Sequence, residues 1–218
     1  MSGKQNVRRS ILLAAMVLVA LEALAQNSPL GSDKPLPATL EEVGQLLSRY
    51  PCTRGDFVQE KHIPSIGRSL TSSGAFLIAA DRGIIWQTKK PYPSIMVVGR
   101  SHVSQGPEAK SLSRMDTGNN RLFMEFSQAI SAAFSGDVQK IQDSFHVDFS
   151  RKGSNWSLQL EPRERTVAQL IQSIQLGGSA VLEEVTMTEQ NGSTITYRFS
   201  NHQFSQEPTQ DENQLFDR

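Results

Sequence analysis

Residues Phe57–Gly99 read FVQEKHIPSIGRSLTSSGAFLIAADRGIIWQTKKPYPSIMVVG. This run contains three strand-like segments, Gly74–Ala80, Gly83–Thr88 and Ser94–Val98, and each is apolar on both faces. A glycine-containing turn separates the first two, and a proline-rich turn separates the second from the third. Such short connections predict an antiparallel meander, and strands that are apolar on both faces need a cover on each. The second face must therefore lie against helices, another sheet or a ligand.

The first 25 residues have the pattern of an export signal. Three basic residues precede an apolar stretch over 11–21, which is shorter than the ~20 residues that span a bilayer. Ala23-Leu24-Ala25 then provides a small-x-small cleavage site, so we predict a signal peptide over 1–25 and a periplasmic product. An uncut membrane anchor is the alternative. Arg8-Arg9 is also compatible with twin-arginine export, although the strongly apolar stretch favours ordinary unfolded (Sec) export.

The composition of the mature chain excludes several classes of protein. Cleavage leaves 218 − 25 = 193 residues, enough for one domain with its own core. Removing Lys4, Arg8, Arg9 and Glu22 from the balance of 22 basic and 22 acidic residues leaves 19 against 21, which does not favour nucleic acid as a partner. Cys52 is the only cysteine, so no internal disulfide can form, and we interpret it as an inert residue after a helix.

The pattern of the mature chain predicts its domain organisation. We expect a flexible segment over 26–37, a domain over 38–205 and a flexible tail over 206–218. An amphipathic helix is predicted to begin at a capping box, Thr39–Glu42, and to end at Pro51, and a second helix is predicted over 120–134. Segments in which apolar and polar residues alternate then follow as far as Phe199, and this alternation predicts β-strands. The predicted fold is mainly β, an unclosed antiparallel β-barrel of about nine to eleven strands with helices on its open side.

Motifs for catalysis were not found in the sequence. The four histidines are scattered, without the spacing of a metal site, and no Gly-x-Ser-x-Gly elbow is present. Acidic pairs such as Glu41-Glu42 and Glu183-Glu184 are adjacent in sequence, so their side chains point in different directions. We therefore expect no enzyme activity, no metal and no cofactor.

The order of several short motifs resembles the periplasmic outer-membrane lipoprotein carriers, the LolA family. In the N-terminal half these are Phe57-x-Gln59, Ser73-Gly74-x-Phe76-x-Ile78, Gly83-Ile84-Ile85-Trp86 and Pro91. In the C-terminal half they are Leu160-Glu161-Pro162, Leu182–Met187, and Asn191-Gly192-x-Thr194 with Tyr197-x-Phe199. The resemblance extends from about Leu40 to Phe204, which is nearly all of the mature chain.

The resemblance implies a monomeric carrier with a hydrophobic cavity under a helical lid, which shields the acyl chains of a lipoprotein crossing the periplasm. It also implies an inner-membrane releasing complex and an outer-membrane acceptor as partners. In typical members an arginine that lies six residues before the tryptophan forms hydrogen bonds to the lid helices. Here that position is Ala80. Arg82 is the nearby candidate for a lid latch, and the cargo could be another lipid.

The candidate lipid-contacting residues are large apolar side chains of the predicted strands and lid. They are Phe57, Phe76, Ile78, Ile84, Trp86, Met96, Leu122, Phe126, Ile130, Trp156, Met187 and Tyr197. The helix with Val43, Leu46 and Leu47 would share the lid role with the helix over 120–134. The alternative is a non-catalytic envelope β-domain whose core is permanently filled and which acts through protein contacts. A secreted hydrolase is the third and weakest hypothesis.

Overall fold

The structure is a computed structural model, and it describes residues 37–99, 102–114, 132 and 137–218. From residue 37 onward these belong to one compact unit, Leu36–Arg218. The predicted signal peptide, nearly all of the predicted segment 26–37, and the candidate lid residues Leu122, Phe126 and Ile130 lie outside the described residues. No described helix is both long and apolar enough to cross a membrane.

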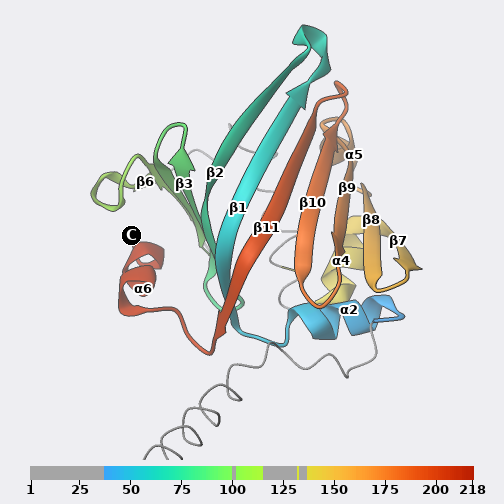
Figure 1. The fold of residues 1–218 in the computed structure, drawn as a ribbon, viewed down its shortest axis with the longest axis horizontal. Coiled ribbons are helices and arrows are strands. Elements are labelled where there is room, and N and C mark those ends of the chain that lie inside the picture. The colour runs from blue at the N-terminus through green and yellow to red at the C-terminus, as the bar shows by residue number, and fades with distance from the viewer. Residues whose placement is uncertain (1–36, 100–101, 115–131, 133–136) are drawn as a thin grey trace, which may run out of the picture. The chain divides into compact units, whose positions relative to one another are not determined.

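The described part of the chain forms one antiparallel sheet of eleven strands that is not closed (Figure 1). Its order is β6-β5-β4-β3-β2-β1-β11-β10-β9-β8-β7, so β1 pairs with β11 and joins two meanders. The strands are β1 (Cys52–Ile63), β2 (Arg68–Ala79), β3 (Gly83–Lys90), β4 (Ser94–Gly99), β5 (Val103–Gly106), β6 (Ser113–Arg114), β7 (Phe145–Lys152), β8 (Asn155–Pro162), β9 (Ile171–Gly178), β10 (Leu182–Glu189) and β11 (Thr194–Ser205). The predicted mainly β, unclosed fold is confirmed.

Short helices accompany the sheet. They are α2 (Leu40–Leu47), α4 (Val138–Ser144), α5 (Arg165–Ala168), α6 (Gln210–Phe216) and the 3-10 turns η1 (Pro64–Ile66) and η2 (Ala109–Ser111). The predicted N-cap of the first helix is confirmed, because the Thr39 side chain accepts a hydrogen bond from the Glu42 amide. The reciprocal half of the predicted capping box differs, because the Glu42 carboxylate accepts from the Ala38 amide and not from that of Thr39. Helix α4 was not predicted from the sequence. The predicted helix over 120–134 lies, apart from Ala132, outside the described residues.

The longest hairpin is β1–β2, and it projects beyond its neighbour β3 (Figure 1). All twelve residues of β1 pair with β2, from Cys52 opposite Ala79 to Ile63 opposite Arg68. Strand β3 pairs with β2 only from Ser73 onward, so the edge of β2 over 68–72 extends beyond the end of β3 by about 17 Å, while β1 stays paired with β11 up to His62. The two strands are connected through Pro64 by a tight 3-10 turn that Gly67 ends at φ 58°.

The C-terminal residues differ from the prediction. A flexible tail was expected over 206–218, but residues 210–216 form α6, which packs against β3 and β4. A complete capping box between Thr209 and Glu212 begins the helix, and Phe216 at its end is buried. The sequence signal, Thr209-x-x-Glu212, was present but was not used, because the stretch contains few apolar residues for a helical stripe.

The sheet has two apolar faces. The inner face is defined by the cluster that contains Phe57, Phe76 and Trp86, and it draws residues from both meanders. The outer face is defined by the smaller cluster of Leu77, Ile85 and Val97 with neighbours from the same strands. Alternate residues of β2–β4 therefore enter different cores, which explains why these strands are apolar at nearly every position.

Candidate functional site

Aromatic rings occupy the centre of the inner face. The rings of Phe57 and Trp86 meet edge to face with centroids 5.1 Å apart, and those of Phe76 and Phe199 do so at 5.0 Å. The Tyr197 ring lies 5.5 Å from that of Trp86. All five side chains are at most 7% exposed. The register produces this cluster, because Phe57 pairs with Phe199, Phe76 with Trp86, and neighbouring strands place paired residues on one face.

The inner face brings together every described strand residue that the sequence analysis selected. Ile78, Ile84, Trp156 and Met187 are buried in the same cluster as the aromatic rings, and Met96 packs against it partly buried. The indole Nε1 of Trp156 donates to the Ser179 carbonyl oxygen at 2.8 Å, which fixes its orientation. The positions of these residues agree with the prediction, but their contact with a lipid remains a prediction.

Sequence reasoning omitted several inner-face residues. Phe199 lies on the same face of β11 as Tyr197, two residues further along, and the period-two pattern had already indicated that face. Leu158, Leu160, Ile174 and Leu176 are each at most 1% exposed and extend the face across β8 and β9. Their alternation was visible in the sequence, but only the pairing of β8 with β9 places them beside one another.

Helical elements cover the inner face. Val43 and Leu47 of α2, Ile141 of α4 and Ala132 all belong to the inner cluster and are at most 5% exposed. Helices α2 and α4 also contact each other. This agrees with the expectation that the first helix would cover the open side of the sheet. These contacts are between apolar side chains, whose attraction has no preferred direction. Helix α4 also accepts two hydrogen bonds from Arg163, which follows β8: the side chain donates to the Gln142 carbonyl oxygen at 2.8 Å and the amide to the Ser144 carbonyl oxygen at 3.0 Å.

The chemistry of the inner face is apolar. Burial raises the pKa of the Tyr197 hydroxyl, so that group is neutral at all physiological pH values. At one end of the face, burial lowers the pKa of His202, whose ring lies 6.0 Å from that of Phe76. No group of three metal-ligating side chains is found among the described residues. The face can hold apolar groups, and it presents neutral side chains to them.

Polar side chains cross the inner face where it meets the projecting hairpin. The Ser72 hydroxyl donates to the Gln59 side-chain oxygen at 3.1 Å, and the Lys61 ammonium lies 2.8 Å from the Glu189 carboxylate. Glu189 is only 5% exposed, so this ion pair neutralises a buried charge. The apolar cluster thus ends at a polar boundary before the tip of β1–β2.

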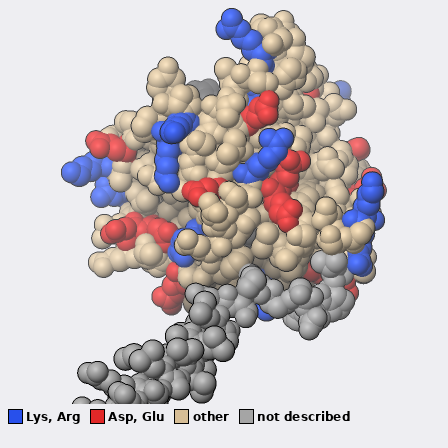
Figure 2. All heavy atoms as spheres, in the orientation of Figure 1, with Lys and Arg blue, Asp and Glu red and all other residues tan. Residues whose placement is uncertain are grey.

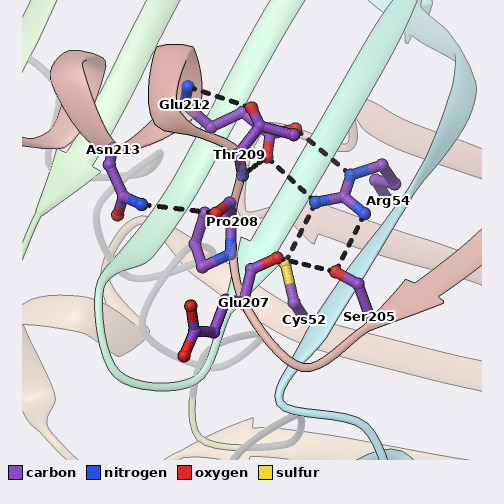
Figure 3. Close-up of polar contacts among 8 residues, drawn as sticks. All are labelled: Cys52, Arg54, Ser205, Glu207, Pro208, Thr209, Glu212 and Asn213. Atoms are coloured by element: carbon purple, nitrogen blue, oxygen red, sulfur yellow. Dashed lines mark hydrogen bonds and ion pairs between the residues drawn. The ribbon is translucent and has the colours of Figure 1, made fainter.

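The outer face is covered by α6, which charged hydrogen bonds fix in place (Figure 3). The Arg54 guanidinium donates from Nε and Nη2 to the two Glu212 oxygens, at 3.1 and 2.9 Å, and from Nη1 to Ser205 Oγ at 3.0 Å. Burial opposes ionisation of Glu212, but the bonds from Arg54 and Thr209 outweigh it and lower the pKa of that carboxyl. Burial raises the pKa of the neighbouring Cys52 thiol, which keeps it protonated.

Arg82 also belongs to the outer face. Its guanidinium pairs with the Asp217 carboxylate and lies 5.5 Å from the centre of the Phe216 ring. The expectation that Arg82 could hold a lid over the inner face is therefore not supported, because its described contacts hold α6. Ala80 is exposed, and its amide donates to the Pro51 carbonyl oxygen.

A shallow groove of about 230 Å³ lies beside α6 on the outer face. Arg54, Asp56, Gln87 and Leu215 are among its lining residues. The groove lies beside a β-bulge, at which Gly55 of β1 faces two residues of β11. Asn201 in this bulge adopts φ 53°, and its side-chain amide donates to the Asp56 carboxylate at 2.8 Å. A Cβ at position 55 would lie 2.5 Å from the Ser200 carbonyl oxygen, so only glycine fits this bulge.

The fold and the site together define a class: an unclosed antiparallel sheet whose aromatic inner face is covered by helical elements. The family model described as outer membrane lipoprotein carrier protein LolA matches residues 52–215. The chain therefore belongs to the LolA family. At the level of the family it is a carrier or binding protein of the periplasm.

The solved structures to which this chain is similar are distant in sequence. A LolA superfamily protein from Nitrosomonas europaea is 11% identical, with a TM-score of 0.44 over 79% of this chain and 96% of that chain. A DUF1329 family protein from Desulfovibrio piger is 10% identical, with a TM-score of 0.45 over 78% and 92%. MucB in the Pseudomonas aeruginosa MucA/MucB complex is 10% identical, with a TM-score of 0.43 over 79% and 59%. Comparison with curated proteins gave no significant match.

Proposed function

We propose that this protein is a periplasmic carrier that holds the acyl chains of a lipoprotein or another lipid against the inner face and delivers them toward the outer membrane. The observation that supports this proposal is the aromatic inner face of a LolA-family chain, covered by separate short helical elements. Delivery in this family implies a donor at the inner membrane and an acceptor at the outer membrane. The exported form would begin after Ala25.

The energetics favour exchange between the cover and an acyl chain. Burying a methylene group contributes ~0.8 kcal/mol, so one long acyl chain gives on the order of 10 kcal/mol before costs. The empty protein regains part of this energy when Val43, Leu47 and Ile141 pack on the inner face. The net free energy of binding is then the difference between covering the inner face with an acyl chain and covering it with the helices. Because this difference is smaller than either contribution, the cargo can leave.

A filled-core domain that acts through protein contacts is the second candidate. The near-complete burial of the inner face favours it, since Trp86 is only 4% exposed and Trp156 only 2% exposed with the cover in place. The two candidates differ in whether the cover can be displaced. In the carrier, an acyl chain replaces the contacts that α2 and α4 make with the inner face. In the filled-core domain these contacts are permanent.

The two tryptophans allow a direct test, because both lie in the inner cluster and the chain has no others. Brominated fatty acid added to the mature protein should quench tryptophan fluorescence at micromolar concentration. Trp86→Phe and Trp156→Phe, each leaving one reporter, should both remain quenchable. Val58→Gln, on the exposed outer side of β1, is the matched control and should bind normally. An absence of quenching, with no lipid in native mass spectra, would falsify the carrier and favour the filled core.

A further inference from the structure

We propose that the end of the sheet formed by the β1–β2 tip and the β3–β4 turn is a contact surface for an anionic phospholipid bilayer. This surface, called here the projecting end, comprises Ile66, Arg68, Leu70, Lys90 and Tyr92 and has Leu170 beside it. The inference rests on the proposed carrier function for its purpose. Its evidence is separate, namely the distribution of exposed apolar and basic side chains.

Exposed large apolar side chains gather at this end. Of the described residues, Ile66 is 61% exposed, Leu70 58%, Tyr92 82% and Leu170 41%. Leu170 belongs to the same end because its carbonyl oxygen accepts from the Gln190 amide in the β10–β11 turn, which lies beside Pro64. A soluble surface usually scatters such side chains singly, so their collection at one end indicates a contact surface.

The charges at this end are basic. The sequence from 61 to 107 contains one acidic residue, Asp81, and that residue lies in the β2–β3 turn at the opposite end of the hairpin. Arg68 pairs with Ile63 at the tip, and Lys89 and Lys90 end β3. Figure 2 shows basic atoms at the tip of the molecule among uncharged ones. Basic side chains with aliphatic and aromatic ones match the headgroups and the acyl boundary of an anionic membrane.

The geometry connects this surface to the inner face. Leu70 pairs with Lys61, four residues from Phe57 on the same strand, so both point to the inner side of the sheet. The inner face therefore continues through the polar boundary of Gln59 and Ser72 onto the exposed hairpin. A membrane that receives Ile66 and Leu70 would meet the same side of the sheet that is proposed to hold the acyl chain.

A bilayer is favoured over a protein partner by this composition. The five side chains of the projecting end lie on two separate turns, and the tip extends about 17 Å beyond the last β3 pairing. Exposed basic and apolar side chains on separate hairpin ends can enter a soft interface without needing a complementary shape. A protein partner would require that complementarity.

Vesicle flotation tests the proposal with the mature protein. Vesicles of phosphatidylcholine with phosphatidylglycerol should bind the protein, and vesicles of phosphatidylcholine alone should bind it less. Ile66→Ser combined with Leu70→Ser should lower partitioning at least tenfold, because two large side chains stay in water. Arg68→Gln and Lys90→Gln should each lower it about fivefold on anionic vesicles and have less effect at high salt.

Two control variants separate this surface from exposure in general. Val58→Ser removes an exposed apolar side chain outside the projecting end, and Lys152→Gln removes an exposed charge at the β7–β8 turn. Both should bind vesicles like the unmodified protein. Equal binding by the Ile66/Leu70 variant would overturn the proposal. Absence of vesicle binding by the unmodified protein would also overturn it and would leave a protein as the partner of this end.

The outcomes also separate this inference from the carrier function. Variants of the projecting end should still show quenching by brominated fatty acid, because the inner-face tryptophans are unchanged, but they should transfer that lipid to vesicles more slowly. Vesicle binding without any quenching would support the surface and contradict the carrier. Quenching without vesicle binding would support the carrier and contradict the surface.

Discussion

The two faces of β2–β4 are covered in different ways. On the inner face α2 and α4 pack through apolar side chains, α4 also accepts hydrogen bonds from Arg163, and the cluster spans both meanders. On the outer face α6 is fixed by the bidentate Arg54–Glu212 pair and by Arg82, over a cluster built from one meander. Apolar contacts can be replaced by any apolar group, whereas directional charged bonds specify one partner. The comparison is what the proposed carrier needs: an inner cover held mainly by apolar contacts and an outer cover held by charged ones.

The largest expected effect is on the inner core. Trp156→Ala should lower the free energy of unfolding by about 3–5 kcal/mol, because it empties a fully buried site and leaves the Ser179 carbonyl oxygen without its donor. Urea unfolding measures this change. Trp156→Phe, which keeps most of the volume, should cost clearly less, and equal losses for the two variants would show that the site is not tightly packed.

Removing the anchor of the outer cover should have a smaller effect. Phe216→Ala should lower the free energy of unfolding by about 2 kcal/mol, since α6 loses its buried side chain and uncovers part of the outer cluster. Quenching by brominated fatty acid should not change. A large change in lipid binding would contradict the separation of the two faces.

The smallest expected effect concerns the charge that holds α6. The pKa of Glu212 is lowered from its ordinary value of 4.5, so its ionised form stabilises the fold. This contribution is present above pH 4.5 and is lost as the pH falls through the lower pKa of the folded state.

Glu212→Gln tests this contribution. The substitution should cost about 1–2 kcal/mol at neutral pH and should flatten the loss of stability below pH 4.5. Unfolding curves at several pH values compare it with Glu207→Gln, whose side chain is exposed. Parallel pH profiles for the Glu212 variant and the unmodified protein would contradict an ionic attachment of α6.

Much of the fold could be predicted from local patterns. The meander over 74–98, the alternating segments up to Phe199 and the first helix all agree with the structure, because turn residues, alternation and helix N-caps act over a few residues. The inner-face candidates on the strands were also found, since large apolar residues at alternate positions must share one face.

The errors have physical reasons too. Arg82 was assigned to a lid because its proximity to Trp86 in sequence says nothing about which distant helix it meets, and α6 is more than 120 residues away. The tail was taken as flexible because a seven-residue helix is unstable alone and exists only through docking.

The sequence by itself determined that β2–β4 need two covers, because nearly every position of those strands is apolar. Only the tertiary structure decided what those covers are: α2, α4 and Ala132 on the inner face, and α6 on the outer one. Strand pairing also decided that Phe57, Trp86 and Tyr197 meet, since β1 joins the two meanders. These contacts link residues far apart in the chain, and their partners are selected by packing in three dimensions and not by spacing in the sequence.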